Sequence, residues 1–140
     1  MGLKLTLKPN EKLIINGCVI QNADRRQTLT IENRADVIRG IDLLDESEAA
    51  TPTKEVYFFV QSAMLRPEIR DDITPEIQQR LGRLVPVFNV EIGGHLIEAA
   101  NHVSARNYYN ALRAIKPVIA YEEELLKLFG DKDGSVVAAE

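Results

Sequence analysis

Residues 12–21 read KLIINGCVIQ, and this stretch decides the fold of the N-terminal part of the chain. Two short apolar runs, KLII and CVIQ, flank the dipeptide Asn16-Gly17. Both residues of this dipeptide tolerate a positive φ, which a type I′ turn requires. The stretch therefore predicts a tight β-hairpin.

Residues 1–44 continue this strand-like pattern on both sides of the hairpin. LKLTL at residues 3–7 places alternate leucines on one face, and QTLTIE at 27–32 alternates in the same way, which predicts that Leu29 and Ile31 are buried. VIRGIDLL follows at 37–44. About five short strands at this density predict a small antiparallel sheet or barrel.

The rest of the chain has helical periodicity. Thr51-Pro52 has the form of an N-cap followed by proline at the first helical position, and Thr74-Pro75 repeats it. VYFFV at 56–60 also fits a strand, but the start signal favours a helix. Pro86 and then Asn89 should kink or end the second helix, and Gly130 should close the last. The sequence thus predicts an α+β protein with a β module at 1–44, a linker at 45–53, a bundle of about four helices at 54–130 and a flexible tail at 131–140.

Composition indicates an ordinary soluble domain, and the charge is unevenly distributed. The chain has 140 residues, 45% of them hydrophobic and 27% charged, with a net charge of −4. No apolar run suits a membrane span or a signal peptide, and the single cysteine fits a reducing cytoplasm. Residues 1–44 hold seven Lys/Arg against five Asp/Glu, whereas residues 45–140 hold ten against sixteen. An anion-binding face is therefore expected in the first segment.

The residue types that carry catalysis do not form a recognisable set. His95 and His102 are seven residues apart, which is not the i, i+4 spacing of two metal-binding histidines. Cys18 lies in an apolar strand and is expected to behave as a small buried hydrophobe. The sequence predicts no enzyme, no cofactor and no metal site.

Two groups of residues remain as binding candidates. Arg25, Arg26, Arg34 and Arg39 all fall in NADRRQTLTIENRADVIRG at 22–40, and they form either a solvated surface or a phosphate-binding face. In the last helix, Tyr108, Tyr109 and Tyr121, together with Leu112, form either bundle core or a seam for a protein partner.

Several separated blocks resemble one protein family. LKLTLKPNEKLIINGCVIQNADRRQTLTIEN, TPTKEVYFFV and ARNYYNALRAIKPVIAYEEELL are similar, in this order, to the FlbT family of bacterial flagellum biosynthesis regulators, from about Leu3 to Leu126. The resemblance implies association with the 5′ untranslated leader of flagellin mRNA, with repressed translation or faster decay, and in some bacteria the opposite effect. Arg25 and Arg26 would then contact RNA from a loop, and Arg34 and Arg39 from either side of the last strand.

Residues 1–44 also resemble, more faintly, the carbon storage regulator family of small RNA-binding proteins. LTLKPNE and VIRGIDL stand where that family has its first and closing strands, which makes Lys8 and Arg39 candidates for RNA contact. The family's dimers imply a homo-oligomer. A rival interpretation assigns the helices to docking flagellin or a flagellar co-regulator protein, and the two interpretations are compatible.

Overall fold

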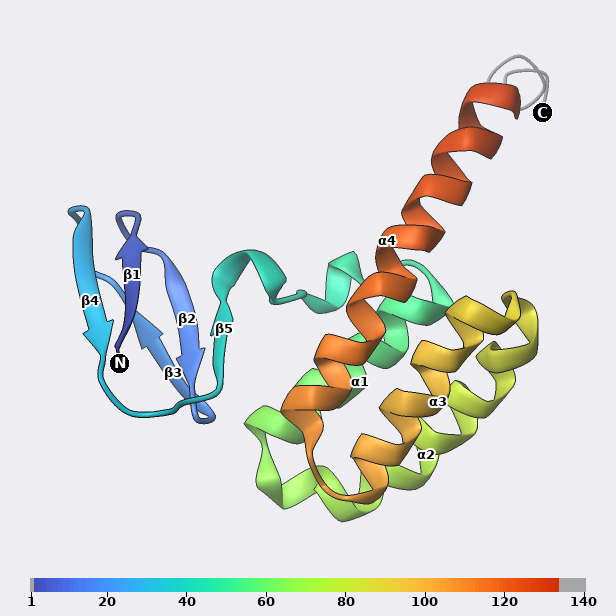
Figure 1. Ribbon diagram of the computed structural model, residues 1–140, viewed down its shortest axis with the longest axis horizontal. Coiled ribbons are helices and arrows are strands. Elements are labelled where there is room, and N and C mark those ends of the chain that lie inside the picture. Colours follow the sequence, from blue (N-terminus) through green and yellow to red (C-terminus); the bar gives the residue numbers. More distant parts are fainter. Residues whose placement is uncertain (1, 134–140) are drawn as a thin grey trace. The chain divides into compact units, whose positions relative to one another are not determined.

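The computed structural model describes residues 2–133, with side chains for residues 2–129. The chain divides into two compact units, Met1–Leu44 and Asp45–Glu140. Antiparallel strands build the first, called here the β unit, and helices build the second, called the helical unit (Figure 1). The predicted α+β class is confirmed.

The β unit contains five short strands in two small sheets. They are β1 (Leu3–Leu7), β2 (Lys12–Ile15), β3 (Cys18–Gln21), β4 (Gln27–Ile31) and β5 (Val37–Arg39). β1 pairs with β4 in one sheet, and β2 lies between β3 and β5 in the other. All three pairings are antiparallel.

The predicted hairpin forms between β2 and β3. Asn16 and Gly17 have φ values of 50° and 83°, so both central residues of the turn adopt the left-handed conformation that the type I′ turn needs. The Asn16 side-chain oxygen also accepts a hydrogen bond from the amide of Asp36, at 2.9 Å. The turn is thereby attached to the chain that enters β5.

A small apolar core holds the β unit together. Leu5, Leu7 and Leu13 are buried, and Ile15, Ile31 and Val37 pack against them. Leu29 was predicted to be buried, but its side chain is 37% exposed. The reason is that β4 pairs only with β1, so no further strand covers this part of its surface.

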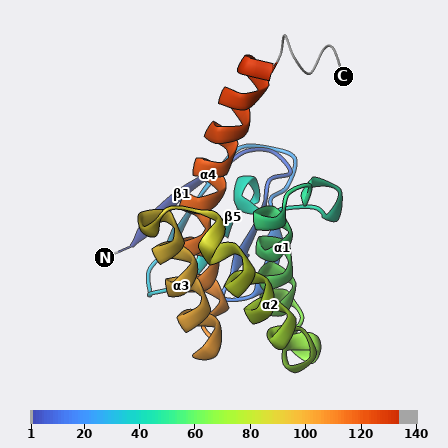
Figure 2. The same cartoon turned by 90° about the vertical axis from the view of Figure 1, so that its right-hand side faces the viewer.

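Four helices make up the helical unit. They are α1 (Pro52–Leu65), α2 (Arg70–Leu84), α3 (Val90–Ser104) and α4 (Tyr108–Asp133). Each of α2 and α4 packs against both α1 and α3 (Figures 1 and 2). Short 3-10 turns occur at Gly40–Asp42 (η1), Glu46–Glu48 (η2), Pro67–Ile69 (η3) and Val85–Val87 (η4). The fully buried side chains of the bundle include Val56, Val60, Ile77, Leu81, Leu96, Ile115 and Val118.

The helix at Thr51-Pro52 is confirmed, and the strand alternative for VYFFV is excluded. α1 begins at Pro52, and the Thr51 hydroxyl accepts a hydrogen bond from the amide of Lys54 at 3.1 Å. This side chain satisfies one of the amides that the first helical turn leaves unpaired.

The helix start predicted at Thr74-Pro75 is wrong, because α2 already begins at Arg70. The Arg70 side chain donates to the carbonyls of Ala63 and Met64 at 2.6 and 2.9 Å, so it caps the end of α1 while opening α2. Pro75 lies inside the helix, where it removes one backbone donor without ending the helix.

The later helix boundaries are close to the predicted ones. α2 ends at Leu84, Pro86 falls in η4, and the Asn89 side chain caps α3 by accepting from the amide of Ile92. α4 continues to Asp133, beyond the Gly130 at which its end was predicted. Residues 131–133 of the predicted tail are therefore helical, and residues 134–140 lie outside the described residues. None of the helices described is long and apolar enough to span a membrane.

Two adjacent glycines in α3, Gly93 and Gly94, test how closely α3 packs against η4. Gly94→Ala is expected to stabilise the helical unit by about 1 kcal/mol, the usual cost of glycine in a helix interior, because a Cβ there meets nothing within 4 Å. Gly93→Ala should gain less or lose stability, because its Cβ would lie 3.0 Å from the Val85 carbonyl oxygen. Urea unfolding followed by far-UV circular dichroism measures both; equal gains would contradict the close approach of α3 to η4.

Candidate nucleic-acid interface and docking surfaces

Three of the predicted RNA-contacting residues lie at one end of the β unit. Leu7 of β1 pairs with Gln27 of β4. Lys8 follows Leu7 and Arg26 precedes Gln27, so both residues leave the sheet at the same end. Arg25 precedes Arg26 in the loop between β3 and β4. All three residues are exposed.

The buried side chain of Asn22 joins the loop between β1 and β2 to the loop between β3 and β4. The side-chain amide of Asn22, a residue that is 8% exposed, donates to the carbonyls of Lys8 at 2.8 Å and Arg25 at 3.0 Å. Asn10 adds a backbone bond to the carbonyl of Ala23 at 2.8 Å. The backbones that carry Lys8 and Arg25 are thus fixed close to each other, while their side chains point into solvent.

Lys12 was not singled out from the sequence, and it belongs to the same end. It pairs with Gln21 at the end of the β2–β3 ladder, and it lines a surface hollow together with Lys8, Glu11 and Arg39. The only sequence signal was its position at the first residue of a strand. We call Lys8, Lys12, Arg25 and Arg26 the basic end of the β unit.

Arg39, another predicted RNA-contacting residue, makes contacts within the fold. Its guanidinium pairs with the Glu11 carboxylate at 2.8 Å and donates to the carbonyl of Thr6 at 2.9 Å. Thr6 lies in β1 and Arg39 in β5, so this side chain connects the two sheets.

Glu11 is ionised by the same arrangement. The amide of Lys8 donates to its carboxylate at 2.9 Å, and this hydrogen bond is the main reason that the pKa of Glu11 lies below its ordinary value. The Arg39 guanidinium lowers the pKa further, and partial burial opposes both. Glu11 therefore remains negatively charged at neutral pH and keeps Arg39 in place.

Arg34 lies away from the basic end. β4 begins next to Arg26 and ends at Ile31, which pairs with Leu3 at the other end of β1, and Arg34 follows that end. A five-residue strand separates the two ends by about 13 Å at 3.3 Å per residue. Arg34 is exposed, and no described residue makes an ion pair with it, with Arg25 or with Arg26.

Two of the four residues predicted for protein docking are core residues. Tyr108 and Leu112 are 3% and 2% exposed. The Tyr108 hydroxyl is 2.9 Å from that of Thr74, and the Arg70 guanidinium lies over its ring. Neither side chain is accessible to a partner.

The other two tyrosines are half-buried on α4. The Arg113 guanidinium lies 5.8 Å from the ring centre of Tyr109. The Tyr121 ring meets Phe88 edge-on at 6.1 Å, near the start of α3. Tyr121 is therefore partly accessible at the corner where α4 leaves the bundle.

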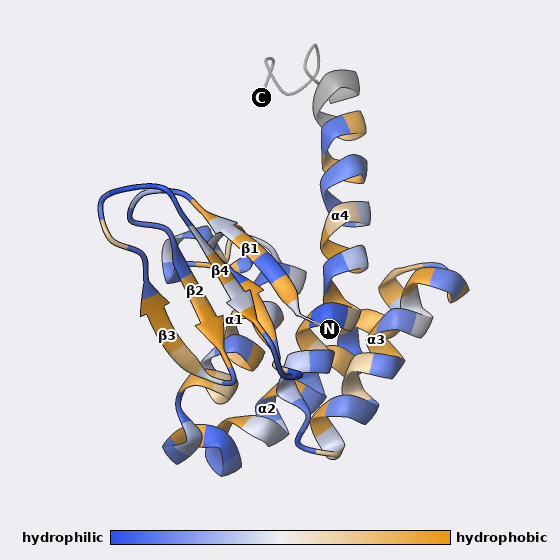
Figure 3. Cartoon of the chain, turned by 60° about the vertical axis from the view of Figure 1, so that its left-hand side comes forward, coloured by the Kyte–Doolittle hydropathy of each residue, from blue (hydrophilic) through white to orange (hydrophobic). Residues whose placement is uncertain are grey.

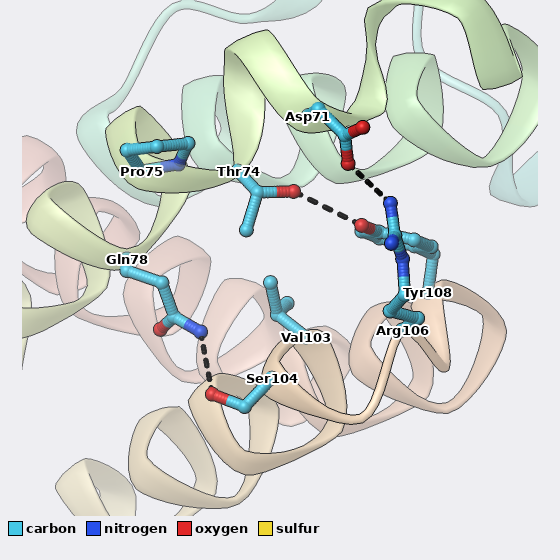
Figure 4. A pocket seen from close by; sticks show the side chains of 8 residues that line it. All are labelled: Asp71, Thr74, Pro75, Gln78, Val103, Ser104, Arg106 and Tyr108. Atoms are coloured by element: carbon cyan, nitrogen blue, oxygen red, sulfur yellow. Dashed lines mark hydrogen bonds and ion pairs between the residues drawn. The ribbon is translucent and has the colours of Figure 1, made fainter.

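A polar hollow lies between α2 and the turn from α3 to α4 (Figure 4). Its polar groups bind one another: Thr74 bonds Tyr108, Asp71 pairs with Arg106, and Gln78 donates to Ser104 at 3.0 Å. These bonds connect α2 to the α3–α4 turn. The hollow thus presents side chains that are already paired, and we assign it a structural role.

The outer turns of α4 form an apolar surface that sequence reasoning missed. The Thr51 hydroxyl at the start of α1 donates to the Glu122 carboxylate, and Lys54 pairs with Glu123. Beyond them Leu126, Leu128 and Phe129 are 53%, 63% and 54% exposed. The helical repeat places Phe129 and half-buried Leu125 in line with the buried stripe of Ala111, Ile115 and Val118. Leu128 lies on one side of this line and Leu126 on the other. The continuous stripe was visible in the sequence, but not the point at which the bundle stops covering it.

Cys18, expected to be buried, is exposed because β3 is an outer strand. Among the residues described, no three His, Cys, Asp or Glu side chains gather closely enough to hold a metal ion.

Comparison with known proteins identifies the family. The family model described as "Flagellar protein FlbT" matches residues 3–126, which is most of the chain. The chain therefore belongs to the FlbT family, and the predicted resemblance is confirmed. No solved structure matches the chain.

Curated relatives match this chain over most of their own length, and their names describe repressors of flagellum biosynthesis. The "Flagellum biosynthesis repressor protein FlbT" of Caulobacter vibrioides (strain ATCC 19089 / CIP 103742 / CB 15) is 38% identical over 127 residues, covering 90% of each chain. A probable repressor of the same name from Rhodopseudomonas palustris (strain TIE-1) is 38% identical over 129 residues, covering 90% of this chain and 98% of its own. That from Mesorhizobium japonicum is 33% identical over 125 residues, covering 89% and 84%.

Removing the charge of Glu11 tests the connection between the two sheets. Glu11→Gln should destabilise the β unit by about 1.5 kcal/mol at neutral pH, the scale of a hydrogen bond to a charged group. Because the folded-state pKa is lowered, this stability is present above the ordinary value of 4.5 and is lost as the pH falls through the folded value.

The difference between the wild type and Glu11→Gln should therefore shrink below pH 4.5. Unfolding should be followed by NMR at the amides of β2 and β5, since all four tyrosines lie in the helical unit. A difference that does not change with pH would show that the carboxylate charge is not what holds Arg39.

Proposed function

We propose that this protein is a post-transcriptional regulator of flagellum biogenesis that binds the 5′ untranslated leader of flagellin mRNA in the cytoplasm. The observation that carries the proposal is the basic end: four cations gather there, and its two arginines have no carboxylate partner among the described residues. Family membership and the repressor names of the relatives supply the flagellar context.

The chemistry of the basic end suits RNA. Guanidinium groups donate paired hydrogen bonds to phosphate oxygens and stack on unpaired bases, and both arginines lie in an exposed loop. The hollow lined by Lys8 and Lys12 adds two ammonium groups, and Asn22 joins the backbone of Lys8 to that of Arg25. The helical unit is acidic and repels a polyanion, so contact is confined to the β unit.

Binding alone is sufficient for this activity. A protein held on the leader covers or exposes the ribosome-binding site, and a transcript that is not translated is open to cellular nucleases. No catalytic group is required.

Removing the cations of the basic end tests the RNA assignment. Lys8→Ala/Arg25→Ala/Arg26→Ala should weaken binding to a purified flagellin leader and lower the salt slope by about 2, because each lost phosphate contact on single-stranded RNA lowers the slope by roughly 0.7. Fluorescence anisotropy between low and moderate salt measures both quantities.

Arg34→Ala is the matched control, because it removes an exposed guanidinium from the opposite end of β4. It should leave both affinity and slope unchanged. Arg39 is left intact, since its loss would disturb the fold. Wild-type affinity and slope in the triple variant would eliminate the basic end as the RNA contact.

A second function is favoured by the apolar surface of α4. We propose that the helical unit also docks a flagellar protein, flagellin or a co-regulator, through an amphipathic helix of that partner. Within this surface, Leu128 and Phe129 together with half-buried Leu125 form a stripe that lies between Glu122 and Glu124 on the helix. A partner helix with an apolar face and basic flanks therefore complements it.

Substitution of exposed residues on this stripe tests the docking proposal. Leu128→Ser/Phe129→Ser should weaken binding to purified flagellin at least tenfold, the scale of one or two lost apolar anchors. Ile97→Ser on α3 is the control, because Ile97 is exposed to a similar extent, 52%. Isothermal titration calorimetry without RNA provides the measurement. Equal flagellin affinity in wild type and double variant, or no binding by either, would remove flagellin as the partner of α4.

A further inference from the structure

β3 is an outer strand with unusual exposure. It pairs with β2 on one side, and every one of its four residues is exposed, with Val19 at 59% and Ile20 at 38%. Figure 3 shows it as a largely hydrophobic strand at the margin of its sheet. An apolar strand in this position is a ready template for another strand.

The pairing with β2 determines which backbone groups of β3 are free. The two-residue turn makes Ile15 and Cys18 a hydrogen-bonded pair, and the bond from the Asn22 amide to the Glu11 carbonyl, 2.8 Å, continues the alternation. Val19 and Gln21 therefore direct their amides and carbonyls away from β2. None of these four groups has a hydrogen-bond partner in the part of the chain that the structure describes.

The usual protection of a sheet edge is missing from β3. Its sequence, Cys-Val-Ile-Gln, contains no lysine, no other charge and no proline. The opposite outer strand of this sheet, β5, has three residues and ends in Arg39. The two edges of the sheet thus differ, and β3 is the one open to pairing.

We propose that β3 pairs antiparallel with β3 of a second copy of this chain, joining two three-stranded sheets into one of six strands. A register that places Val19 opposite Gln21 of the second copy satisfies all four outward groups of each strand with four hydrogen bonds. It also sets Ile20 beside Ile20 of the second copy, a close apolar pair across the twofold axis.

Three observations select a second copy as the occupant. Two identical strands that pair antiparallel are related by a twofold axis. The pair therefore closes as a dimer, and β3 is not left open to a third copy. Because β3 is uncharged, self-pairing sets no like charges against each other. The β unit has only 44 residues and a small core, and units of this size commonly gain stability by oligomerisation. The pairing holds whether or not the basic end binds RNA.

The expected oligomer is tested by sedimentation equilibrium of the full chain. Wild type should be dimeric at about 100 μM, since an interface of this kind needs only micromolar affinity to be filled there. Val19→Lys, which places a charge on the edge, should weaken association at least tenfold. Val19→Pro should act similarly, because it removes only an outward amide. Val90→Lys, at a residue 93% exposed on α3, is the control and should remain dimeric.

Cys18 locates the contact independently, because it is the one cysteine of the chain and its side chain is exposed. The proposed register separates the two Cys18 Cα atoms by about 14 Å, four residues along the strands and one strand spacing across. Nitroxide labels there should report a short distance by pulsed electron paramagnetic resonance. A monomeric wild type, a dimer unaffected by both Val19 variants, or labels more than about 40 Å apart would each overturn the proposal.

Discussion

The ion pair between Arg39 and Glu11 is the contact on which the arrangement of the β unit depends. Glu11 accepts the amide of Lys8 and the guanidinium of Arg39, and Arg39 also reaches a carbonyl of β1. One pair of side chains thus connects the β1–β4 sheet, the β3–β2–β5 sheet and the loop between β1 and β2. Because the Arg39 guanidinium is engaged in this contact, the proposed function assigns RNA contact to the cations that have no carboxylate partner among the described residues.

Those remaining cations are organised by a neutral side chain. Asn22 binds the carbonyls of the loops that carry Lys8 and Arg25, so the basic end has a defined backbone although its charged groups are in water. Two arginines of the acidic helical unit act within the bundle: Arg70 closes α1, and Arg80 pairs with Glu55 and Glu76. The charge is thus distributed unevenly, with a net positive β unit and a net negative helical unit.

Local signals in the sequence predicted most of the fold. The Asn16-Gly17 turn, the alternating strands and the Thr51-Pro52 cap all act through neighbouring residues, and the structure contains each of them. Predictions that depended on distant residues were weaker. The start of α2 is set by Arg70 reaching back to α1, and Cys18 is exposed because no strand lies beyond β3. For the candidate site, the loop arginines were recognisable in the sequence, whereas the pairing of Arg39, the burial of Tyr108 and the exposed turns of α4 required the tertiary structure.

The connectivity of the β unit determines when the basic end comes into existence during folding. The β2–β3 hairpin closes through two residues, and such hairpins form within about 1–10 μs. β1 and β4 instead pair residues as far apart in the chain as Leu3 and Ile31, with the whole hairpin between them. Their pairing therefore costs more loop-closure entropy. The hairpin side already joins Lys8 to Arg25 through Asn22, whereas Lys8 is placed beside Arg26 only by the pairing of Leu7 with Gln27. A chain in which only the hairpin has formed therefore lacks the completed basic end.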